Sequence, residues 1–215
     1  MALEKIMIIV GKGVVRKAPV VFSSVGLGSC VVVTLYDAKR HIGGFAHILL
    51  PGNRQRTTTL PLSTARERET KNERRKKGMR YEDALPQVPS IVLTTLSGGR
   101  PRDSASAGEH MFLDETYHYT DTAIAALLAE MTRQGASLRD IAAKIAGGAK
   151  MFADGEHYEA SIGGRNVKSV KQLLKKEKIP ILGEDTGGDY GRNVDFHLDS
   201  GRVVVSTIGG MKKEI

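Results

Sequence analysis

The chain of 215 residues contains a single cysteine, no tryptophan and only 5% aromatic residues. One cysteine cannot form an internal disulfide, and a secreted protein rarely carries a free thiol. We therefore expect the protein to reside in a reducing cytoplasm. Zinc sites built mainly from cysteine are excluded, and the six histidines show no paired ligand spacing, so the sequence predicts no metal site.

The sequence also lacks a long hydrophobic run. No stretch of about 18 or more uncharged apolar residues occurs, so no membrane span is predicted. The apolar part of the first ten residues is too short for a secretory signal peptide, and Glu4 comes too early for one. These residues are more typical of a first β-strand. The remaining composition, 40% hydrophobic and 26% charged, is that of a globular protein with a substantial core.

Positive charge is abundant, but it is concentrated in one segment. The formal net charge is +8, and residues 54–80 hold 10 Lys/Arg against 3 Glu, so the rest of the chain is nearly neutral. No aromatic residues are interleaved with the run Arg74–Lys77, so we expect no nucleic-acid partner. A basic nucleic-acid-binding protein stays open as a less favoured alternative. The segment better suits peripheral contact with an acidic protein surface or an anionic membrane.

Hydrophobic patterning predicts both strands and helices. Predicted strands lie at 5–10, about 19–24, 30–36, 42–50, 142–146, from 180, 193–198 and 202–207, with turns at 11–13 and 184–188. Apolar residues at helical spacing predict one helix that Gly135 ends and a second that begins near residues 162–166. Residues 52–116 are interpreted as a long, partly flexible insertion. The pattern indicates a single α+β domain over residues 1–215, with about eight strands and two main helices.

The candidate chemistry centres on the only cysteine. Cys30 follows the glycine-rich stretch that contains Gly28 and Ser29, and His47 lies in the strand that forms a predicted hairpin with the strand after Cys30. A histidine beside a thiol can accept its proton, and the imidazolium can then protonate a leaving amine. Backbone N–H groups at Gly28 and Ser29 can stabilise an oxyanion, and Ser24 or Ser29 can orient the imidazole. The sequence does not fix the register that would bring thiol and imidazole together.

The same residues permit a structural interpretation. A lone cysteine followed by valines is more often a small buried hydrophobe than a nucleophile. A histidine on an apolar strand is likewise more often a core residue with its hydrogen bonds satisfied. Composition and spacing therefore permit thiol catalysis at Cys30 and His47 without establishing it.

Six motifs follow one another along the chain. They are Gly26–Asp37, Ile42–Pro51, Tyr119–Asp121, Lys144–Phe152, Ile162–Val167 and Glu184–Arg192. In this order they resemble the chemoreceptor glutamine deamidases of bacterial and archaeal chemotaxis, the CheD family, over about residues 5–52 and 117–210. The resemblance implies a layered sandwich of mixed β-sheet with two main helices, similar to cysteine-hydrolase deamidases. The insertion at 52–116 departs from the family, whose members usually have a much shorter connection there.

The resemblance also implies roles for individual residues. Cys30 is the expected nucleophile and His47 the expected general base and acid. The family has a threonine six residues before its cysteine, and Ser24 occupies that position here, with Ser23 as a neighbour that could compete for the role. The residues before the cysteine, Gly28 and Ser29, form the implied nucleophile loop.

The implied reaction is hydrolysis of glutamine side-chain amides in methyl-accepting chemotaxis receptors, giving glutamate and ammonia. It needs no metal or organic cofactor. The resemblance further implies a second partner, a CheC-type phosphatase. The alternative is a non-catalytic adaptor that has the same fold and binds CheC or receptors without performing chemistry.

Overall fold

The computed structural model describes residues 4–52, 115–151, 157–207 and 209–215. The insertion predicted at 52–116 lies almost entirely outside these residues. In chain order the described elements are β1 (Lys5–Met7), β2 (Gly13–Lys17), β3 (Val21–Leu27), β4 (Val31–Asp37), β5 (Ile42–Ile48), α2 (Thr120–Arg133), β6 (Ile141–Gly147), η2 (Tyr158–Ala160), α3 (Ile162–Lys176), β7 (Ile181–Thr186), β8 (Arg192–His197), β9 (Arg202–Thr207) and β10 (Lys212–Glu214).

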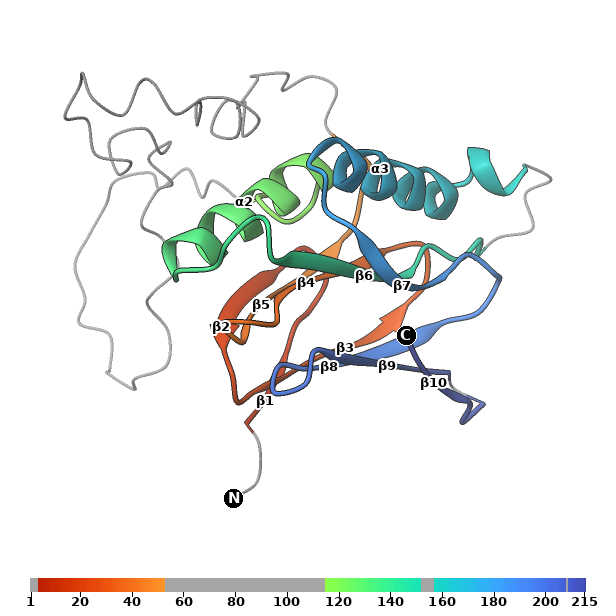
Figure 1. Ribbon diagram of the computed structural model, residues 1–215. Helices are drawn as coiled ribbons and strands as arrows, with labels where there is room; N and C mark the ends of the chain where they lie inside the picture. The colour runs from red at the N-terminus through yellow and green to blue at the C-terminus, as the bar shows by residue number, and fades with distance from the viewer. Residues whose placement is uncertain (1–3, 53–114, 152–156, 208) are drawn as a thin grey trace, which may run out of the picture. The chain divides into compact units, whose positions relative to one another are not determined.

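The described strands form two mixed sheets of five strands each. One sheet has the order β2-β5-β4-β6-β7 and the other the order β1-β3-β8-β9-β10. In the first sheet β4 pairs antiparallel with both β5 and β6, so it is the central strand. Figure 1 shows α2 and α3 on one side of this sheet and the second sheet on its other side. The α+β layered fold expected from the sequence is confirmed.

The first of two hydrophobic cores lies between the helices and the sheet that they cover. From the sheet it takes Val31 and Val33 of β4, together with residues of β5 and β6. The buried face of α2 consists of Ala123, Ile124, Leu127, Leu128 and Met131, as the helical spacing predicted. Helix α3 starts where Ser161 accepts a hydrogen bond from the Gly164 N–H at 3.1 Å.

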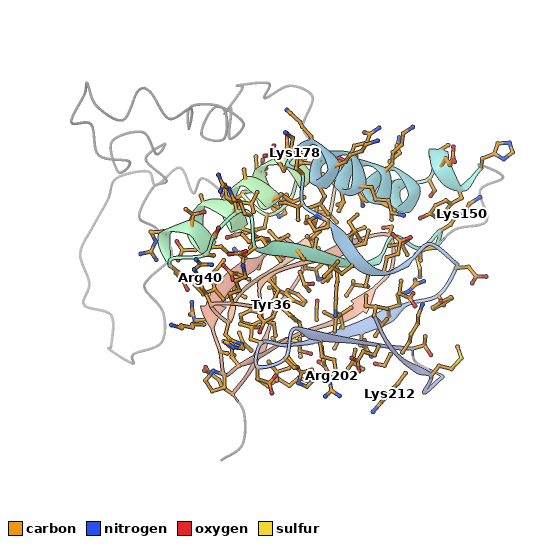
Figure 2. All side chains as sticks on the ribbon, viewed as in Figure 1. Tyr36, Arg40, Lys150, Lys178, Arg202 and Lys212 are labelled. Carbon is orange, nitrogen blue, oxygen red and sulfur yellow. The ribbon has the colours of Figure 1, made fainter. Side chains whose placement is uncertain are left out.

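The second core lies between the two sheets. Phe22 from β3 and Phe45 from β5 meet there edge to face, with ring centroids 6.0 Å apart. Val32 belongs to this core, whereas its neighbours in β4 face the helices. Since side chains alternate along a strand, odd-numbered residues of β5 and even-numbered residues of β3 near these positions point into the space between the sheets. Figure 2 shows the side chains that fill this space, with Tyr36 at one end of it.

The strand predictions need three corrections. The first strand ends at Met7, and a separate strand, β2, follows the turn at Gly11, where φ is +72°. Residues 184–186, predicted as part of a turn, belong to β7, whose alternately exposed pattern at the sheet edge tolerates polar side chains. The described residues contain ten strands and not eight, because β2 and β10 were missed. The sequence of β10 is Lys-Lys-Glu, which lacks apolar residues because all three are exposed on an edge strand.

Candidate active site

The β4–β5 register puts Cys30 and His47 on the same face of one sheet. Val32 lies directly opposite His47, and Val31 directly opposite Ile48. Cys30 stands two residues before Val32, so its side chain shares the face of Val32, which lines the space between the sheets. Cys30 and His47 are therefore diagonal neighbours across the hairpin. The hairpin predicted at 30–36 and 42–50 is confirmed, and the fold supplies the register.

Ser24 reaches His47 from the other sheet. Its Oγ lies 2.8 Å from Nδ1 of His47 and also donates a hydrogen bond to the Ile8 carbonyl oxygen at 2.7 Å. A hydroxyl has one proton to donate, and Ile8 takes it, so the serine oxygen accepts the Nδ1–H of the imidazole. This assigns the neutral tautomer with an unprotonated Nε2. Ser24 and His47 are 1% and 4% exposed, so water does not compete for these bonds.

Ser23 does not compete with Ser24 for the imidazole. In β3 the two serines point to opposite faces, and Ser23 is hydrogen-bonded to the carboxylate of Asp195, its cross-strand partner. Together with Lys5, that bond lowers the pKa of Asp195 against the effect of partial burial. Of these two serines, Ser24 is the one hydrogen-bonded to His47.

The electrostatics keep both reactive groups neutral at rest. Burial lowers the pKa of His47 to about 4, and the nearby Ile8 carbonyl opposes this only in part. Burial also raises the pKa of the Cys30 thiol, while its own backbone N–H acts in the opposite direction. Among the described residues Nε2 of His47 has no hydrogen-bond partner, so no bond joins it to the thiol. In this state the thiol and the imidazole are therefore both neutral and form no ion pair.

The turn after β6 holds the nucleophile loop. Gly148 N–H donates to the Cys30 carbonyl at 2.7 Å, and Ala149 N–H donates to the Gly28 carbonyl at 2.8 Å. Gly147 has φ +108°, and a Cβ at this position would overlap the Cys30 carbonyl oxygen. A glycine at position 147 is therefore required by the close approach of two backbones at Cys30.

Comparison with known proteins identifies the family of the chain. The family model described as "CheD chemotactic sensory transduction" matches residues 103–207. A probable chemoreceptor glutamine deamidase CheD of Caldanaerobacter subterraneus is 31% identical over 196 residues, covering 91% of this chain and 88% of the relative. The chain belongs to the CheD family. The chemoreceptor glutamine deamidases CheD of Thermotoga maritima and Halalkalibacterium halodurans are each 31% identical, covering 94% and 92% of this chain and 90% of each relative.

The matched regions differ in what they include. The match to the family model begins after both Cys30 and His47, so it includes neither residue. The three relatives leave out less than a tenth of the chain, so their matches include Ser24, Cys30 and His47. Membership therefore covers the region of the candidate site as well as the fold around it.

The motif Glu184–Arg192 of this CheD chain contacts the segment after β6, which in turn contacts the loop before Cys30. Buried Arg192 forms an ion pair at 2.6 Å with the partly buried Asp185, and Gly187 N–H donates to the Gly147 carbonyl at 3.0 Å. Gly188 accepts from the backbone N–H of Lys150 at 2.8 Å. Figure 2 labels Lys150 at the end of the sandwich away from Tyr36, which is the end where β6 finishes and the nucleophile loop lies. These contacts give the motif a structural role, which is to hold the turn after β6 in place.

One residue of the site was not singled out from the sequence. Asn166 of α3 is fully buried, and its Nδ2 donates to the carbonyls of Ser29 and Leu49, each at 2.9 Å. A signal was present, because Asn166 is a polar residue on the apolar face that Val167 and Val170 define.

Residues 4–52, 115–151, 157–207 and 209–215 contain no cluster of three or more His, Cys, Asp or Glu side chains arranged to bind a metal ion. Over the same residues, none of the helices has the length and hydrophobicity needed to cross a membrane.

Proposed function

We propose that this protein is a chemoreceptor glutamine deamidase, in which Cys30 is the nucleophile, His47 the general base and acid, and Ser24 the residue that orients the imidazole. The single observation that carries the proposal is the Ser24 Oγ–His47 Nδ1 hydrogen bond of 2.8 Å. It leaves the basic nitrogen Nε2 free on the face that the thiol shares. The names of the relatives, chemoreceptor glutamine deamidase CheD, supply the substrate class.

In the first half of the reaction, Nε2 of His47 takes the thiol proton as Sγ of Cys30 attacks the side-chain amide carbon of a receptor glutamine. Backbone N–H groups of the nucleophile loop, at Gly28, Ser29 and Cys30, donate to the oxyanion that forms. The imidazolium then protonates the nitrogen, the C–N bond breaks, and ammonia leaves from a thioester.

In the second half, Nε2 of His47 removes a proton from water as the water oxygen attacks the thioester carbon. The C–S bond breaks, the thiolate of Cys30 takes the proton back from the imidazolium, and glutamate remains on the receptor. The net reaction consumes one water and releases one ammonia. No cofactor takes part in these steps.

A neutral resting pair suits this chemistry. Since the pKa of His47 is lowered to about 4, the imidazole is unprotonated and ready to act as a base at neutral pH. The cost of forming thiolate and imidazolium in a buried site is met when the substrate amide displaces water and supplies polar contacts. We therefore place the proton transfer after receptor binding, so that little thiolate is exposed to water before the receptor is bound.

The test is mass spectrometry of a receptor co-expressed with the wild-type protein or with Cys30→Ala. Wild type should convert specific receptor glutamines to glutamate and release ammonia, whereas Cys30→Ala should do neither. Ser23→Ala is the matched control, since it removes a neighbouring buried hydroxyl that is hydrogen-bonded to Asp195. Conversion by Cys30→Ala at the wild-type rate would contradict the proposal.

The finer partners belong to the same proposal. We expect the enzyme to act in the cytoplasm, on the cytoplasmic part of receptors, and to bind a CheC-type phosphatase. The basic residues between 54 and 80 would attract an acidic receptor surface or an anionic membrane. Deleting 54–80 should weaken receptor binding at low salt and leave hydrolysis of a short glutamine peptide unchanged. Equal binding by both forms at low salt would exclude this role.

A non-catalytic adaptor is the second candidate, and the raised pKa of the Cys30 thiol favours it. An adaptor would bind receptor or CheC with no need for Cys30 or His47. Its signature is receptor binding without glutamine conversion, unchanged in both Cys30→Ala and His47→Ala. A deamidase instead loses conversion in both variants while receptor binding persists.

A further inference from the structure

Helix α3 contacts the start of the β4–β5 hairpin through one polar side chain. Figure 1 shows α3 lying over the sheet on the side away from β3, and the helix contacts both β4 and β6. Asn166 lies on the side of α3 that faces the sheet and is completely buried. Its Nδ2 donates to the Ser29 carbonyl, one residue before Cys30, and to the Leu49 carbonyl, two residues after His47.

The orientation of this amide is fixed by its neighbours. Both contacts are with carbonyl oxygens, which only accept hydrogen bonds, so the NH₂ group must face them. The ladder between β4 and β5 begins at the pair Val31 and Ile48, and the two carbonyls lie just beyond it. The single side chain of Asn166 therefore closes the open end of the hairpin at the position of Cys30.

This arrangement carries a cost that a purely structural residue would avoid. The Oδ1 atom of Asn166 is buried and has no hydrogen-bond partner among the described residues. A buried acceptor without a partner destabilises the fold, and leucine, of similar size, would bury no such atom but would leave the carbonyls of Ser29 and Leu49 without this donor. The presence of asparagine is explained if the two donated hydrogen bonds serve the site.

The Ser29 contact determines the direction of the Cys30 N–H. In a trans peptide the carbonyl of one residue and the N–H of the next point in opposite directions. When Asn166 holds the Ser29 carbonyl toward α3, the Cys30 N–H points away from the helix, to the side of its own thiol. The carbonyls of Gly28 and Cys30 accept from backbone N–H groups of the turn after β6, and the carbonyl of Ser29 between them accepts from the side chain of Asn166.

We propose that Asn166 is a positioning residue for the deamidase reaction: it fixes the Ser29–Cys30 peptide so that the Cys30 N–H faces the thiol and the oxyanion of the substrate. The proposal rests on the proposed function and deepens it. The same N–H lowers the pKa of the Cys30 thiol against the effect of burial, so its direction matters before and during the reaction.

The kinetic test compares Asn166→Leu, Asn166→Asp and the control Ser169→Ala. Ser169 lies three residues further along α3 and accepts from the Gly52 N–H at 3.1 Å, without touching the loop of Cys30. Asn166→Leu should lower kcat for ammonia release about 100-fold, with KM within about twofold of wild type, since the loss falls on the transition state. Ser169→Ala should keep both constants. A kcat loss in Asn166→Leu no larger than in Ser169→Ala overturns the proposal.

Asn166→Asp keeps the shape and adds a pH signature. As a carboxylate it repels the two carbonyl oxygens, and when protonated it donates one hydrogen bond again. Burial raises the pKa of such a carboxyl, so the ratio of variant to wild-type kcat should rise as the pH falls. A ratio that does not change with pH overturns the proposal. If circular dichroism shows that Asn166→Leu does not fold, the pH dependence of kcat in Asn166→Asp still tests the positioning role of Asn166.

Alkylation of Cys30 separates this proposal from the proposed function. In Asn166→Leu the pH at which alkylation is half-maximal should rise relative to wild type, because the N–H no longer faces the sulfur. It should be unchanged in Ser169→Ala. If wild type releases no ammonia from receptor, the deamidase proposal fails, and the alkylation profile still judges Asn166. Identical profiles for wild type and Asn166→Leu would show that the amide does not act on the thiol.

Discussion

Ser24 Oγ and His47 Nδ1 lie 2.8 Å apart although the two residues belong to different sheets. The hydroxyl of Ser24 is itself fixed, since it donates to the Ile8 carbonyl at the end of the β1 segment. The imidazole is therefore held in one tautomer by a contact that exists only when the sheets are stacked. The site therefore forms only in the folded protein, in which the two sheets are packed together.

Replacing Ser24 should damage catalysis more than stability. Ser24→Ala removes the acceptor of the Nδ1–H, so the imidazole can take the tautomer in which Nε2 carries the proton and is no longer a base. We expect kcat to fall about 100-fold and the free energy of unfolding by about 1–3 kcal/mol. Ammonia release and urea unfolding measure the two effects. A variant with wild-type kcat would exclude Ser24 from the site.

Two companion variants make this result specific. Ser24→Thr restores the residue of the resembled family pattern and keeps Oγ, so kcat should stay within about threefold of wild type. Ser23→Ala removes the hydroxyl bonded to Asp195 on the opposite face and should leave kcat unchanged. A larger loss of kcat in Ser23→Ala than in Ser24→Ala would reverse the assignment of the two serines.

The buried histidine makes stability depend on pH. The pKa of His47 falls from 6.5 in the unfolded chain to about 4 in the fold, so the unfolded state binds more protons between these values. The contribution of His47 to the free energy of unfolding is fully present above pH 6.5. It declines by about 3 kcal/mol as the pH falls toward 4. Urea unfolding of wild type and His47→Gln across this range measures the difference. Parallel curves for the two proteins would contradict it.

The same shift predicts the acid limit of activity. Nε2 of His47 acts as a base only while the imidazole is neutral, and burial keeps it neutral down to a pKa of about 4. The acid limb of kcat/KM should therefore lie near pH 4 and not near the ordinary histidine value of about 6.5. Initial rates on a peptide substrate, within the pH range where the protein stays folded, test this. An acid limb near 6.5 would show that His47 is exposed to solvent.

Substitutions at two glycines with positive φ distinguish the effect of backbone strain from the effect of contact with the nucleophile loop. Gly147 has φ +108°, and an added Cβ would overlap the Cys30 carbonyl, whereas Gly135 has φ +99° and open space around it. Gly135→Ala should cost about 1 kcal/mol of stability and leave activity unchanged. Gly147→Ala should cost about 3 kcal/mol or more and abolish ammonia release. Equal effects in both variants would mean that the contact with Cys30 is unimportant.

Local pattern predicted most of the elements of the described fold. The helix through Met131 and the helix that starts after Ser161 follow from apolar spacing, because each buries one face on a sheet. Strands β4 and β5 follow from their apolar content, since both faces of these strands are covered. Strand β10 could not be predicted in this way, because an exposed edge strand places no demand on the polarity of its side chains.

The candidate site divides in the same way. Cys30, His47 and Ser24 could be chosen from the sequence because residue type and motif spacing are local properties. The sequence could not exclude Ser23 as a competitor of Ser24, since this depends on which face of β3 turns toward the other sheet. The neutral state of His47 was also beyond the sequence, because burial lowers its pKa and burial is a product of packing.

The sequence by itself determined the residue types of the chemistry, the glycine-rich loop before the thiol, and the helices and inner strands, since each is encoded over a short stretch. Only the tertiary structure decided the register that puts Cys30 beside His47, the sheet stacking that brings Ser24 to Nδ1, and the reach of Asn166 to two loops. These contacts join residues that are 17 to 137 positions apart. Distances over such separations are set by how layers pack, which no local pattern contains.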